Sequence, residues 1–221
     1  MAPFKIVDAN IAMSLLSIPD ILKRDKPDII FCQEINLSSQ TVSDSVTSLG
    51  YRAECNVDPL HPTLPGTAIL WKKTVKISDA NQLIERRAQS IKCAGETYIN
   101  VYAPSGSGNR RERWNFFNDL FTHILQAGGD KLPVMAGDWN SILEQCDTTN
   151  HFQSKYCKVL ARLVRSMNYV DSFRHLHPND REYTFHRGAH VAQSRLDRIY
   201  LPPHLLQHLL SVQHKPGISD H

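Results

Sequence analysis

Residues 132–140 read LPVMAGDWN, and this stretch joins an apolar strand to the start of a polar site. Its first part is a short apolar run of the kind that forms buried strands. Its second part delivers two polar side chains, Asp138 and Asn140, which a buried strand is not expected to carry. The stretch therefore predicts a strand inside a sheet whose end presents polar groups.

The same kind of apolar run recurs along the chain. Five further examples are FKIVDAN, DIIFCQE, TAILWKK, TYINVYAP and SRLDRIYL. Between them lie helical stretches: IPDILKRDK after a capping Ser17, QTVSDSVTSLG, RRERWNFFNDLFTHILQAGG and KYCKVLARLVRSMN. In the third stretch, five residues share one face at helical spacing and are expected to be core: Trp114, Phe117, Phe121, Ile124 and Leu125. This order predicts a layered α/β protein with sheet packed on sheet and helices outside.

The composition fits one globular domain. The chain has 221 residues, of which 41% are hydrophobic and 21% charged, and this length can bury a large core. No run approaches the roughly 18 apolar residues of a membrane span, and the N-terminus lacks the apolar run of a secretory signal. The five cysteines show no C-x-x-C spacing, so they predict neither a disulfide framework nor a zinc knuckle. We therefore expect a soluble, unsecreted protein.

Basic residues gather locally although the formal net charge is only +3. The clusters are ERR ending at Arg87, NRRERW from Asn109 and QSRLDR ending at Arg198. Such clusters suit a polyanionic partner, although solvated surface charge also explains clusters of this kind.

Polar side chains end several of the predicted strands. Asn10, Glu34 and Tyr102 stand in the same position as Asp138 and Asn140. A single acid after a strand is often a turn former or a helix cap, but the repetition favours a common rim where ligands bind. Carboxylate and carbonyl oxygens are the ligands that Mg²⁺ prefers, with substrate phosphates completing its shell.

Asp197 lies within the otherwise apolar strand SRLDRIYL, where a carboxylate is costly unless it finds a partner. A histidine is the natural partner, because an aspartate bonded to one imidazole nitrogen frees the other for acid or base work. The last residues read GISDH, so His221 directly follows an acid and is a candidate.

Six pieces in this order resemble the endonuclease/exonuclease/phosphatase superfamily: Asn10, QE at 33–34, VYAP with Tyr102, GDWN, SRLD, and SDH at 219–221. The superfamily includes DNase I-like nucleases, abasic-site repair endonucleases and the endonuclease domains of LINE-type (non-LTR) retrotransposons. The resemblance spans Asn10 to His221. It implies a DNase I-like four-layer α/β sandwich, in which two packed mixed β-sheets are flanked by helices.

The resemblance also implies roles for the first motifs. Glu34 would be the main ligand of Mg²⁺, with Mn²⁺ as an alternative ion, and Asn10 would be a second metal ligand nearby. Tyr102 and Asn140 would contact the scissile phosphate, and Asp138 would orient or deprotonate the attacking water.

The later motifs complete the implied catalytic set. His221 would pair with Asp197 and stabilise charge on the phosphorane, and Asp220 would lie beside the metal and the phosphate. In-line attack on a phosphodiester needs a cation and positive donors that face the charge on the nonbridging oxygens. A metal, an imidazolium and an amide would supply them.

Within the superfamily the chain most resembles the retrotransposon branch. YTFHRGAHVAQSRLDRIYL is similar to a hairpin of those domains, in which Thr184 matches a DNA-contacting position and the loop from Arg187 to Gln193 would probe the minor groove. Abasic-site enzymes carry a Trp-rich segment here and an acid two residues after the first Asn, whereas this loop has no Trp and that position is Ala12. The residues expected to contact DNA are Thr184, His186, Arg187, Arg195, Ser219, Arg110 and Arg111, with Arg113 as a further candidate.

The resulting expectation is a Mg²⁺-dependent endonuclease that nicks one strand of double-stranded DNA and leaves a 3′-hydroxyl for target-primed reverse transcription. We expect residues 1–221 to be a single domain, monomeric in isolation, cut from a longer polypeptide that also carries a reverse transcriptase. It would act in the nucleus, with no membrane partner.

Three alternatives stay open. An abasic-site repair endonuclease shares the catalytic set. A lipid or inositol phosphoesterase also belongs to the superfamily, but the chain lacks an apolar membrane-docking stretch and its basic residues are spread out. A binding module without catalysis predicts missing catalytic residues, yet all of them are present in this chain.

Overall fold

The computed structural model of the chain describes residues 4–12, 17–106, 109–127, 131–150, 156–186 and 192–215. Four residues of the predicted site therefore lie outside the described residues: Arg187, Ser219, Asp220 and His221. Within the described part no helix is both long and apolar enough to cross a bilayer.

The first sheet has four strands in the order β1 (Ile6–Asn10), β2 (Ile29–Ile35), β4 (Gly66–Lys72) and β3 (Tyr51–Asn56). β1 and β2 are parallel, and the other pairs are antiparallel. Helices α1 (Ser17–Asp25) and α2 (Ser39–Thr47) pack their buried residues against this sheet.

The second sheet has six strands, in the order β5 (Ile77–Ile84), β6 (Ala88–Cys93), β7 (Glu96–Tyr102), β8 (Val134–Asp138), β12 (Asp197–Leu201) and β9 (Val170–Asp171). β7 and β8 are parallel, whereas β12 runs antiparallel to β8. Its outer face is covered by α3 (Arg110–Ala127) and α4 (Lys158–Ser166). Smaller elements are α5 (Ser172–Leu176), the 3-10 helices η1 (Gln145–Asp147) and η3 (Pro203–His208), and the hairpin of β10 (Phe185–His186) and β11 (Gln193–Ser194).

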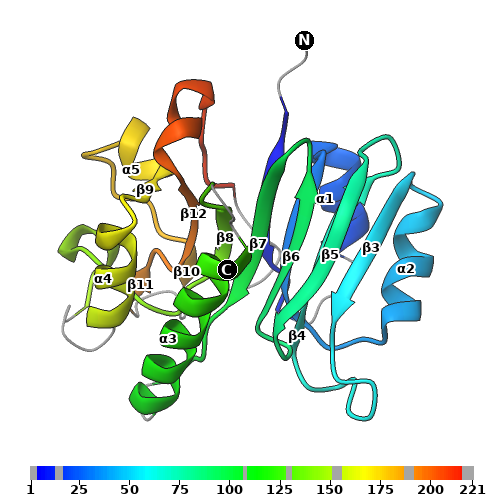
Figure 1. Ribbon diagram of the computed structural model, residues 1–221, viewed down its shortest axis with the longest axis horizontal. Helices are drawn as coiled ribbons and strands as arrows, with labels where there is room; N and C mark the ends of the chain where they lie inside the picture. Colours follow the sequence, from blue (N-terminus) through cyan, green and yellow to red (C-terminus); the bar gives the residue numbers. More distant parts are fainter. Residues whose placement is uncertain are drawn as a thin grey trace.

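The two sheets pack face to face, with helices outside (Figure 1). The alternation of side chains along β2 explains the layers: Ile29 and Phe31 face the other sheet, whereas Ile30 and Cys32 face α1 and α2. Because both faces of β2 are covered, its sequence is a continuous apolar run. The expected four-layer α/β sandwich is confirmed.

The buried face of α3 differs from the predicted one. Phe117 and Ile124 are fully buried as predicted, but Trp114 is 56% exposed and Leu125 is 58% exposed. The helix instead buries Phe116 and Leu120. The apolar residues cover more than one face of this helix, and the position of the second sheet selects the face centred on Phe117.

Candidate active site

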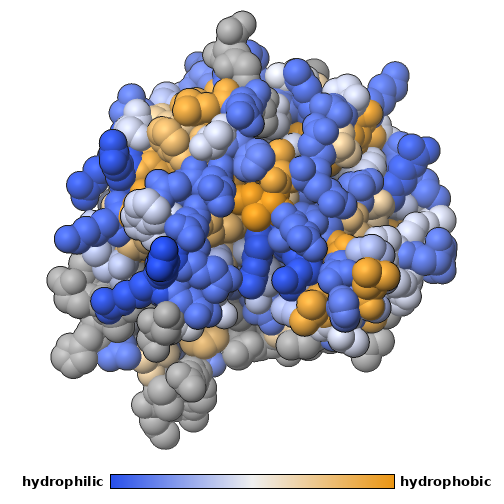
Figure 2. Space-filling view, turned by 60° about the horizontal axis from the view of Figure 1, so that its bottom comes forward, coloured by the Kyte–Doolittle hydropathy of each residue, from blue (hydrophilic) through white to orange (hydrophobic). Residues whose placement is uncertain are grey.

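The strand topology gathers the predicted site residues at one rim of the sandwich. Asn10 pairs in register with Gln33 across the parallel β1 and β2. In the second sheet Tyr102, Asp138 and Asp197 are register neighbours across β7, β8 and β12. The carboxyl ends of β1, β2, β7 and β8 lie at the bottom of Figure 1, and Figure 2 brings this face forward, where hydrophilic residues predominate.

Glu34 is presented by a bulge in β2. The pairing of β2 with β4 shifts register between Gln33 and Ile35, so Glu34 is left out of the ladder, and its φ is +59°. A left-handed conformation is costly for a residue other than glycine, and strain of this kind is concentrated at functional sites. The bulge re-aims the Glu34 side chain at the end of the strand.

Asn10 bridges the two sheets. Its Nδ2 donates to Glu34 Oε1 at 2.9 Å and to Asp138 Oδ2 at 3.1 Å, and its Oδ1 accepts from the backbone N–H of Ala12 at 3.0 Å. Ionised carboxylates only accept hydrogen bonds, so the amide nitrogen must face them. In this arrangement the Asn10 oxygen faces the Ala12 N–H, so Asn10 must turn its amide to offer that oxygen to a cation at Glu34, and its role as a metal ligand stays a prediction.

Asp138 is held in one orientation. It is fully buried, and besides the bond from Asn10 it accepts hydrogen bonds from Asn140 N and Asn140 Nδ2, each at 2.9 Å. Asn140 adopts φ +44°, which asparagine tolerates better than most residues. Its Nδ2 also donates to Ala103 O at 2.9 Å, so a contact from this amide to a phosphate requires it to exchange one of these bonds.

The other two residues of GDWN fix this turn. Gly137 has φ +148°, and a Cβ there would lie 1.9 Å from the carbonyl oxygen of Val101 on β7. Trp139 is fully buried, stacks on Phe117 and donates from Nε1 to the carbonyl oxygen of Arg198 at 3.1 Å. Because Trp139 is anchored in the core, Asp138 and Asn140 on either side of it are fixed at the rim.

Tyr102 is nearly buried, and Arg87 lies with its guanidinium carbon 4.6 Å from the centre of the Tyr102 ring. Burial, followed by the negative charge of Glu34, raises the pKa of Tyr102 to about 12, against the opposing effect of Arg87. The hydroxyl is therefore protonated at neutral pH and can donate a hydrogen bond. Arg87 was predicted only as part of a basic cluster, and its place beside Tyr102 adds a positive charge to the site.

Asp197 begins β12 directly opposite Asp138. Thr184 holds this point of the chain, because its Oγ1 accepts from the backbone N–H groups of Leu196 and Asp197, both at 3.0 Å. Within the described residues the Thr184 hydroxyl donates no hydrogen bond, and its contact with DNA stays a prediction. The predicted pairing of Asp197 with His221 falls on a residue outside the described ones.

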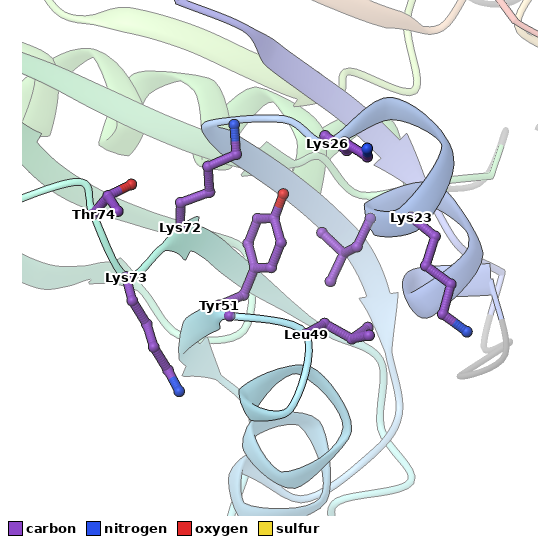
Figure 3. A pocket seen from close by; sticks show the side chains of 9 residues that line it. Lys23, Lys26, Leu49, Tyr51, Lys72, Lys73 and Thr74 are labelled. Atoms are coloured by element: carbon purple, nitrogen blue, oxygen red, sulfur yellow. The ribbon is translucent and has the colours of Figure 1, made fainter.

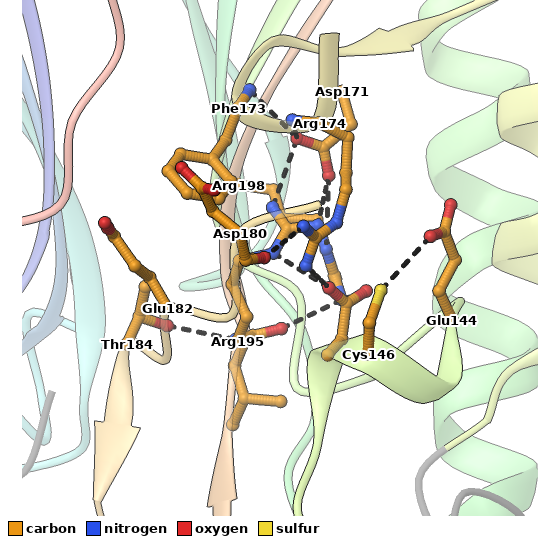
Figure 4. A network of polar contacts seen from close by, with 12 residues as sticks. Glu144, Cys146, Asp171, Phe173, Arg174, Asp180, Glu182, Thr184, Arg195 and Arg198 are labelled. Carbon is orange, nitrogen blue, oxygen red and sulfur yellow. Dashed lines mark hydrogen bonds and ion pairs between the residues drawn. The ribbon is translucent and has the colours of Figure 1, made fainter. Parts of the chain in front are cut away.

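Arg195 was expected to contact DNA, but the structure buries it in an ion-pair cluster (Figure 4). Its Nε donates to Asp147 Oδ1 at 2.9 Å, and its Nη2 donates to Asp171 Oδ2 at 2.6 Å. Only 1% of the residue is exposed, so it cannot reach a phosphate in this conformation. The prediction treats Arg195 as a surface charge, whereas buried carboxylates elsewhere in the chain pair with it.

Asp147 is the centre of that cluster. It also accepts from Arg174 Nη2 at 2.9 Å and Arg198 Nη2 at 3.2 Å, and only 1% of the residue is exposed. Burial alone would raise its pKa, but the guanidinium groups of Arg198 and Arg195 outweigh it and hold the pKa at about 2. The cluster ties the segment after GDWN to the start of β12, and thus supports Asp138 and Asp197 together.

The other predicted DNA contacts divide by exposure. Arg110 and Arg111 at the start of α3 and His186 on the β10–β11 hairpin are exposed, which leaves them available to a ligand. Arg113 is only 7% exposed and donates to the carbonyl oxygens of Pro104 and Gly106. Its expected phosphate contact is therefore replaced by a role in fixing the loop after β7.

Glu34 is the described residue that best fits a hard cation. Its side chain is half-buried, and within the described residues its Oε2 accepts no hydrogen bond. In the same part of the chain no group of three or more His, Cys, Asp or Glu side chains could hold a metal by itself. This donor set suits Mg²⁺, which is commonly held by one or two carboxylates together with substrate phosphates.

An acid that fits a hard cation, a fixed aspartate and a protonated phenol at the rim of an α/β sandwich are the features of a hydrolase of phosphate esters. The family model of the Endonuclease/Exonuclease/phosphatase family matches residues 9–221, and the chain belongs to this family. It is therefore a hydrolytic enzyme of the nuclease and phosphodiesterase class.

Known proteins support the fold. An AP endonuclease from Archaeoglobus fulgidus superposes with a TM-score of 0.78 at 23% identity, covering 92% of this chain and 88% of that one. The 3′-5′ exonuclease NExo from Neisseria meningitidis superposes with the same TM-score at 19% identity and the same coverage of both chains. In sequence, the chain is 33% identical over 121 residues to the transposon TX1 uncharacterized 149 kDa protein of Xenopus laevis. This match covers 52% of the chain but spans only 9% of that protein.

Proposed function

We propose that the chain is a Mg²⁺-dependent DNA endonuclease that nicks one strand of double-stranded DNA and leaves a 3′-hydroxyl, which primes reverse transcription in retrotransposition. The observation that carries the proposal is the amide of Asn10, which joins Glu34 and Asp138 in one site. The similarity to a transposon protein favours the retrotransposon branch. The domain would then act in the nucleus as part of a longer polypeptide with a reverse transcriptase.

Mg²⁺ held by Glu34 and the phosphate would supply Lewis-acid stabilisation of the charge on the nonbridging oxygens. Asp138 orients the attacking water, because its carboxylate is fixed by Asn10 and Asn140. Water adds to phosphorus, the bond to the 3′ oxygen breaks, and the departing oxygen gains a proton to become the 3′-hydroxyl. The protonated Tyr102 hydroxyl donates to the phosphate through this step.

Asp197 stands opposite Asp138 and is proposed to hold His221 as an imidazolium facing the phosphorane. Asp220 would lie beside the metal and phosphate. Arg110, Arg111, Arg187 and His186 would contact the DNA around the cleaved bond, together with Thr184 and Ser219. These assignments rest on the resemblance and on the position of Asp197.

The test is nicking of supercoiled plasmid with Mg²⁺ by the wild type, Glu34→Ala and His221→Ala. We expect both variants to lose at least a hundredfold in rate, since each removes a group that stabilises the transition state. A matched control is Glu85→Ala, which removes an exposed acid outside the site. Wild-type rates in either site variant would show that the mechanism is wrong.

A second assay distinguishes nicking of intact DNA from abasic-site repair. Ala12 occupies the position where abasic-site enzymes carry an acid, and its N–H is committed to Asn10 Oδ1. We therefore expect comparable nicking of an intact duplex and of one with a single abasic site. A strong preference for the abasic duplex would assign the chain to repair, and phosphate release from inositol polyphosphates without nicking would assign it to the phosphoesterases.

A further inference from the structure

A pocket lies at the opposite end of the four-stranded sheet from Glu34. It has a volume of about 470 Å³ and lies where α1 ends, α2 meets β3 and β4 ends (Figure 3). Its Lys72 follows Trp71, which pairs with Ile29 at the start of β2. Glu34 is five positions further along β2, or about 16 Å at a rise of about 3.3 Å per residue. The pocket is therefore separate from the candidate active site.

Lysines dominate the lining of this pocket. Four of its nine lining residues are Lys23, Lys26, Lys72 and Lys73, and no acid is among the nine. Asp28 binds Lys72 Nζ at 2.8 Å, and the carboxyl ends of α1 and α2 each add about half a negative charge. Four ammonium groups outweigh these, so about two positive charges remain. The sequence clusters singled out for a polyanion do not include these lysines, because they come from two distant segments.

The floor of the lysine pocket is apolar. Leu22 is 2% exposed, Leu49 is half-buried, and the Tyr51 hydroxyl donates to the carbonyl oxygen of Pro27 at 2.8 Å. The Tyr51 ring is itself only 4% exposed, so it offers no free face for a base to stack on. Figure 3 shows Tyr51 and Leu49 in the centre, with the labelled lysines around them.

The lysine ammonium groups still have N–H groups that can donate hydrogen bonds to a ligand. Lys73 Nζ donates to Thr47 O at 2.9 Å and Lys72 Nζ donates to Asp28, but each ammonium has three N–H groups. Lys23 and Lys26 are exposed at the end of α1. The helix dipole of α1 favours a basic residue at Lys23, but it does not explain Lys72 and Lys73, which come from β4 and the turn after it.

We propose that the lysine pocket binds a single nucleic-acid strand outside the catalytic site, with a sugar on the apolar floor and the flanking phosphates on the lysines. The volume falls within the range of about 300–1,000 Å³ of small-ligand sites, which admits a nucleotide unit but not a duplex. Binding through phosphates, without an exposed aromatic face, predicts little dependence on base sequence. A duplex held at the catalytic rim would leave the pocket free, because the pocket is at the other end of the sheet.

The test is fluorescence anisotropy of a labelled 20-nucleotide oligothymidylate with the full chain, in EDTA so that no cleavage occurs. The pocket variant is Lys23→Gln/Lys26→Gln, and the matched control is Lys92→Gln/Lys158→Gln, which removes two exposed lysines elsewhere. We expect the pocket variant to bind about tenfold more weakly at low salt. The slope of log affinity against log salt should fall by about 1.4, since each lost phosphate contact on a single strand removes about 0.7. The control should change less than twofold.

Several outcomes would overturn the proposal. Equal losses of affinity in the pocket variant and the control would show that any surface lysine contributes to binding. Unchanged affinity in the pocket variant would show that the strand does not bind in the pocket. A mononucleotide that binds as tightly as the 20-mer would assign the pocket to a free nucleotide. A glutamate-rich peptide containing leucine that binds more tightly than the strand, and is lost in the pocket variant, would assign it to a protein partner.

Plasmid nicking separates this proposal from the proposed function. The pocket variant should nick plasmid at the wild-type rate, because no pocket residue belongs to the catalytic rim. A chain that binds the strand through the pocket but cleaves no DNA would contradict the proposed function alone. A pocket variant that nicks in proportion to its weaker binding would show instead that the pocket holds the cleaved duplex.

Discussion

At the scale of single residues, the geometry of the site depends most on the hydrogen bonds of Asn10. Its amide donates to Glu34 and Asp138, and hydrogen bonds to charged groups are worth about 1.5–3 kcal/mol. We predict that Asn10→Ala lowers the single-turnover nicking rate by about 10- to 100-fold at saturating Mg²⁺, since both carboxylates lose their shared donor. The control is Asn118→Ala, which removes a half-buried amide on α3 that donates to the carbonyl oxygen of Trp114 in the same helix.

The dependence on metal distinguishes two roles for Asn10. An orienting residue lowers the rate at every Mg²⁺ concentration, whereas a metal ligand mainly raises the concentration of Mg²⁺ that is required. If high Mg²⁺ restores the wild-type rate to Asn10→Ala, then Asn10 turns its oxygen to the metal during catalysis. That result would support the role as a metal ligand that the resemblance implies.

The lowered pKa of Asp147 predicts how the stability of the fold depends on pH. Because its pKa is depressed to about 2 in the folded state, its ionised form stabilises the fold above the unfolded pKa near 4. This stability is lost as the pH falls from about 4 to about 2, and it amounts to about 2 kcal/mol. Urea unfolding between pH 5 and pH 2 should therefore show a smaller loss in Asp147→Asn than in the wild type.

Two further variants make this measurement decisive. Asp147→Asn removes the carboxylate that Arg174, Arg195 and Arg198 share and leaves Asp171 as the acid beside Arg195 and Arg198, which costs about 3–5 kcal/mol of stability at neutral pH. If that variant is too unstable to measure, Arg174→Gln removes one donor and should reduce the acid loss by a smaller amount. Asp79→Asn replaces an exposed acid on β5 and should leave the loss of stability between pH 5 and pH 2 unchanged. If Asp147→Asn loses as much stability between pH 5 and pH 2 as the wild type does, then other groups cause the loss.

At the scale of elements, the close approach of β7 and β8 requires Gly137. A Cβ there would meet the carbonyl oxygen of Val101 at 1.9 Å, and the clash is with backbone that cannot move without opening the sheet. We predict that Gly137→Ala lowers the free energy of unfolding by more than about 3 kcal/mol, measured by urea denaturation. Gly95→Ala is the matched control, because its φ is also positive but nothing lies within 4 Å of the added Cβ. That control should lose only about 1–2 kcal/mol, and an equal loss in both would show that φ rather than the clash decides.

The sequence predicts three strands that are buried on both faces, but it does not predict β3 or β6, although most of β6 is also buried. β2, β4 and β8 appear as continuous apolar runs because each lies between the other sheet and a layer of helices. β5 was not predicted, since five of its eight residues are exposed and its sequence ISDANQLI has no apolar run. Such a strand is fixed by its ladder with β6 and not by its own pattern.

The candidate site divides in the same way. Four site residues can be placed at strand ends from the sequence, because each follows an apolar run: Asn10, Glu34, Tyr102 and Asp138. The structure brings all four to one rim. The partners of Arg195 could not be predicted, because Asp147 and Asp171 are far from it in sequence and meet it only through the fold. The orientation of the Asn10 amide is equally invisible in sequence, since it depends on which acceptors surround it.

At the scale of the whole molecule, a buried polar connection joins the two sheets beside the active site. Gln33 Nε2 donates to Asn100 Oδ1 on β7 and to Asp8 Oδ1 on β1, both at 2.8 Å. Asn100 Nδ2 in turn donates to the carbonyl oxygens of Cys32 and Ala68 on the first sheet. Gln33 and Asn100 are fully buried. Apolar packing alone allows two sheets to slide, whereas these directional bonds fix one alignment, and Glu34 directly follows Gln33.

This connection predicts that stability and activity fall together when Gln33 is replaced. Gln33→Leu removes the donor to Asn100, and an unsatisfied buried acceptor costs about 1–3 kcal/mol, which urea denaturation would measure. The nicking rate per folded molecule should also fall, about tenfold, because the sheet that carries Glu34 loses its alignment with the sheet that carries Asp138. Gln40→Leu, which removes an exposed glutamine bonded to Asp44 on α2, should change neither quantity. If Gln33→Leu is destabilised but nicks normally per folded molecule, then the Asn10 bridge by itself aligns the two halves of the site.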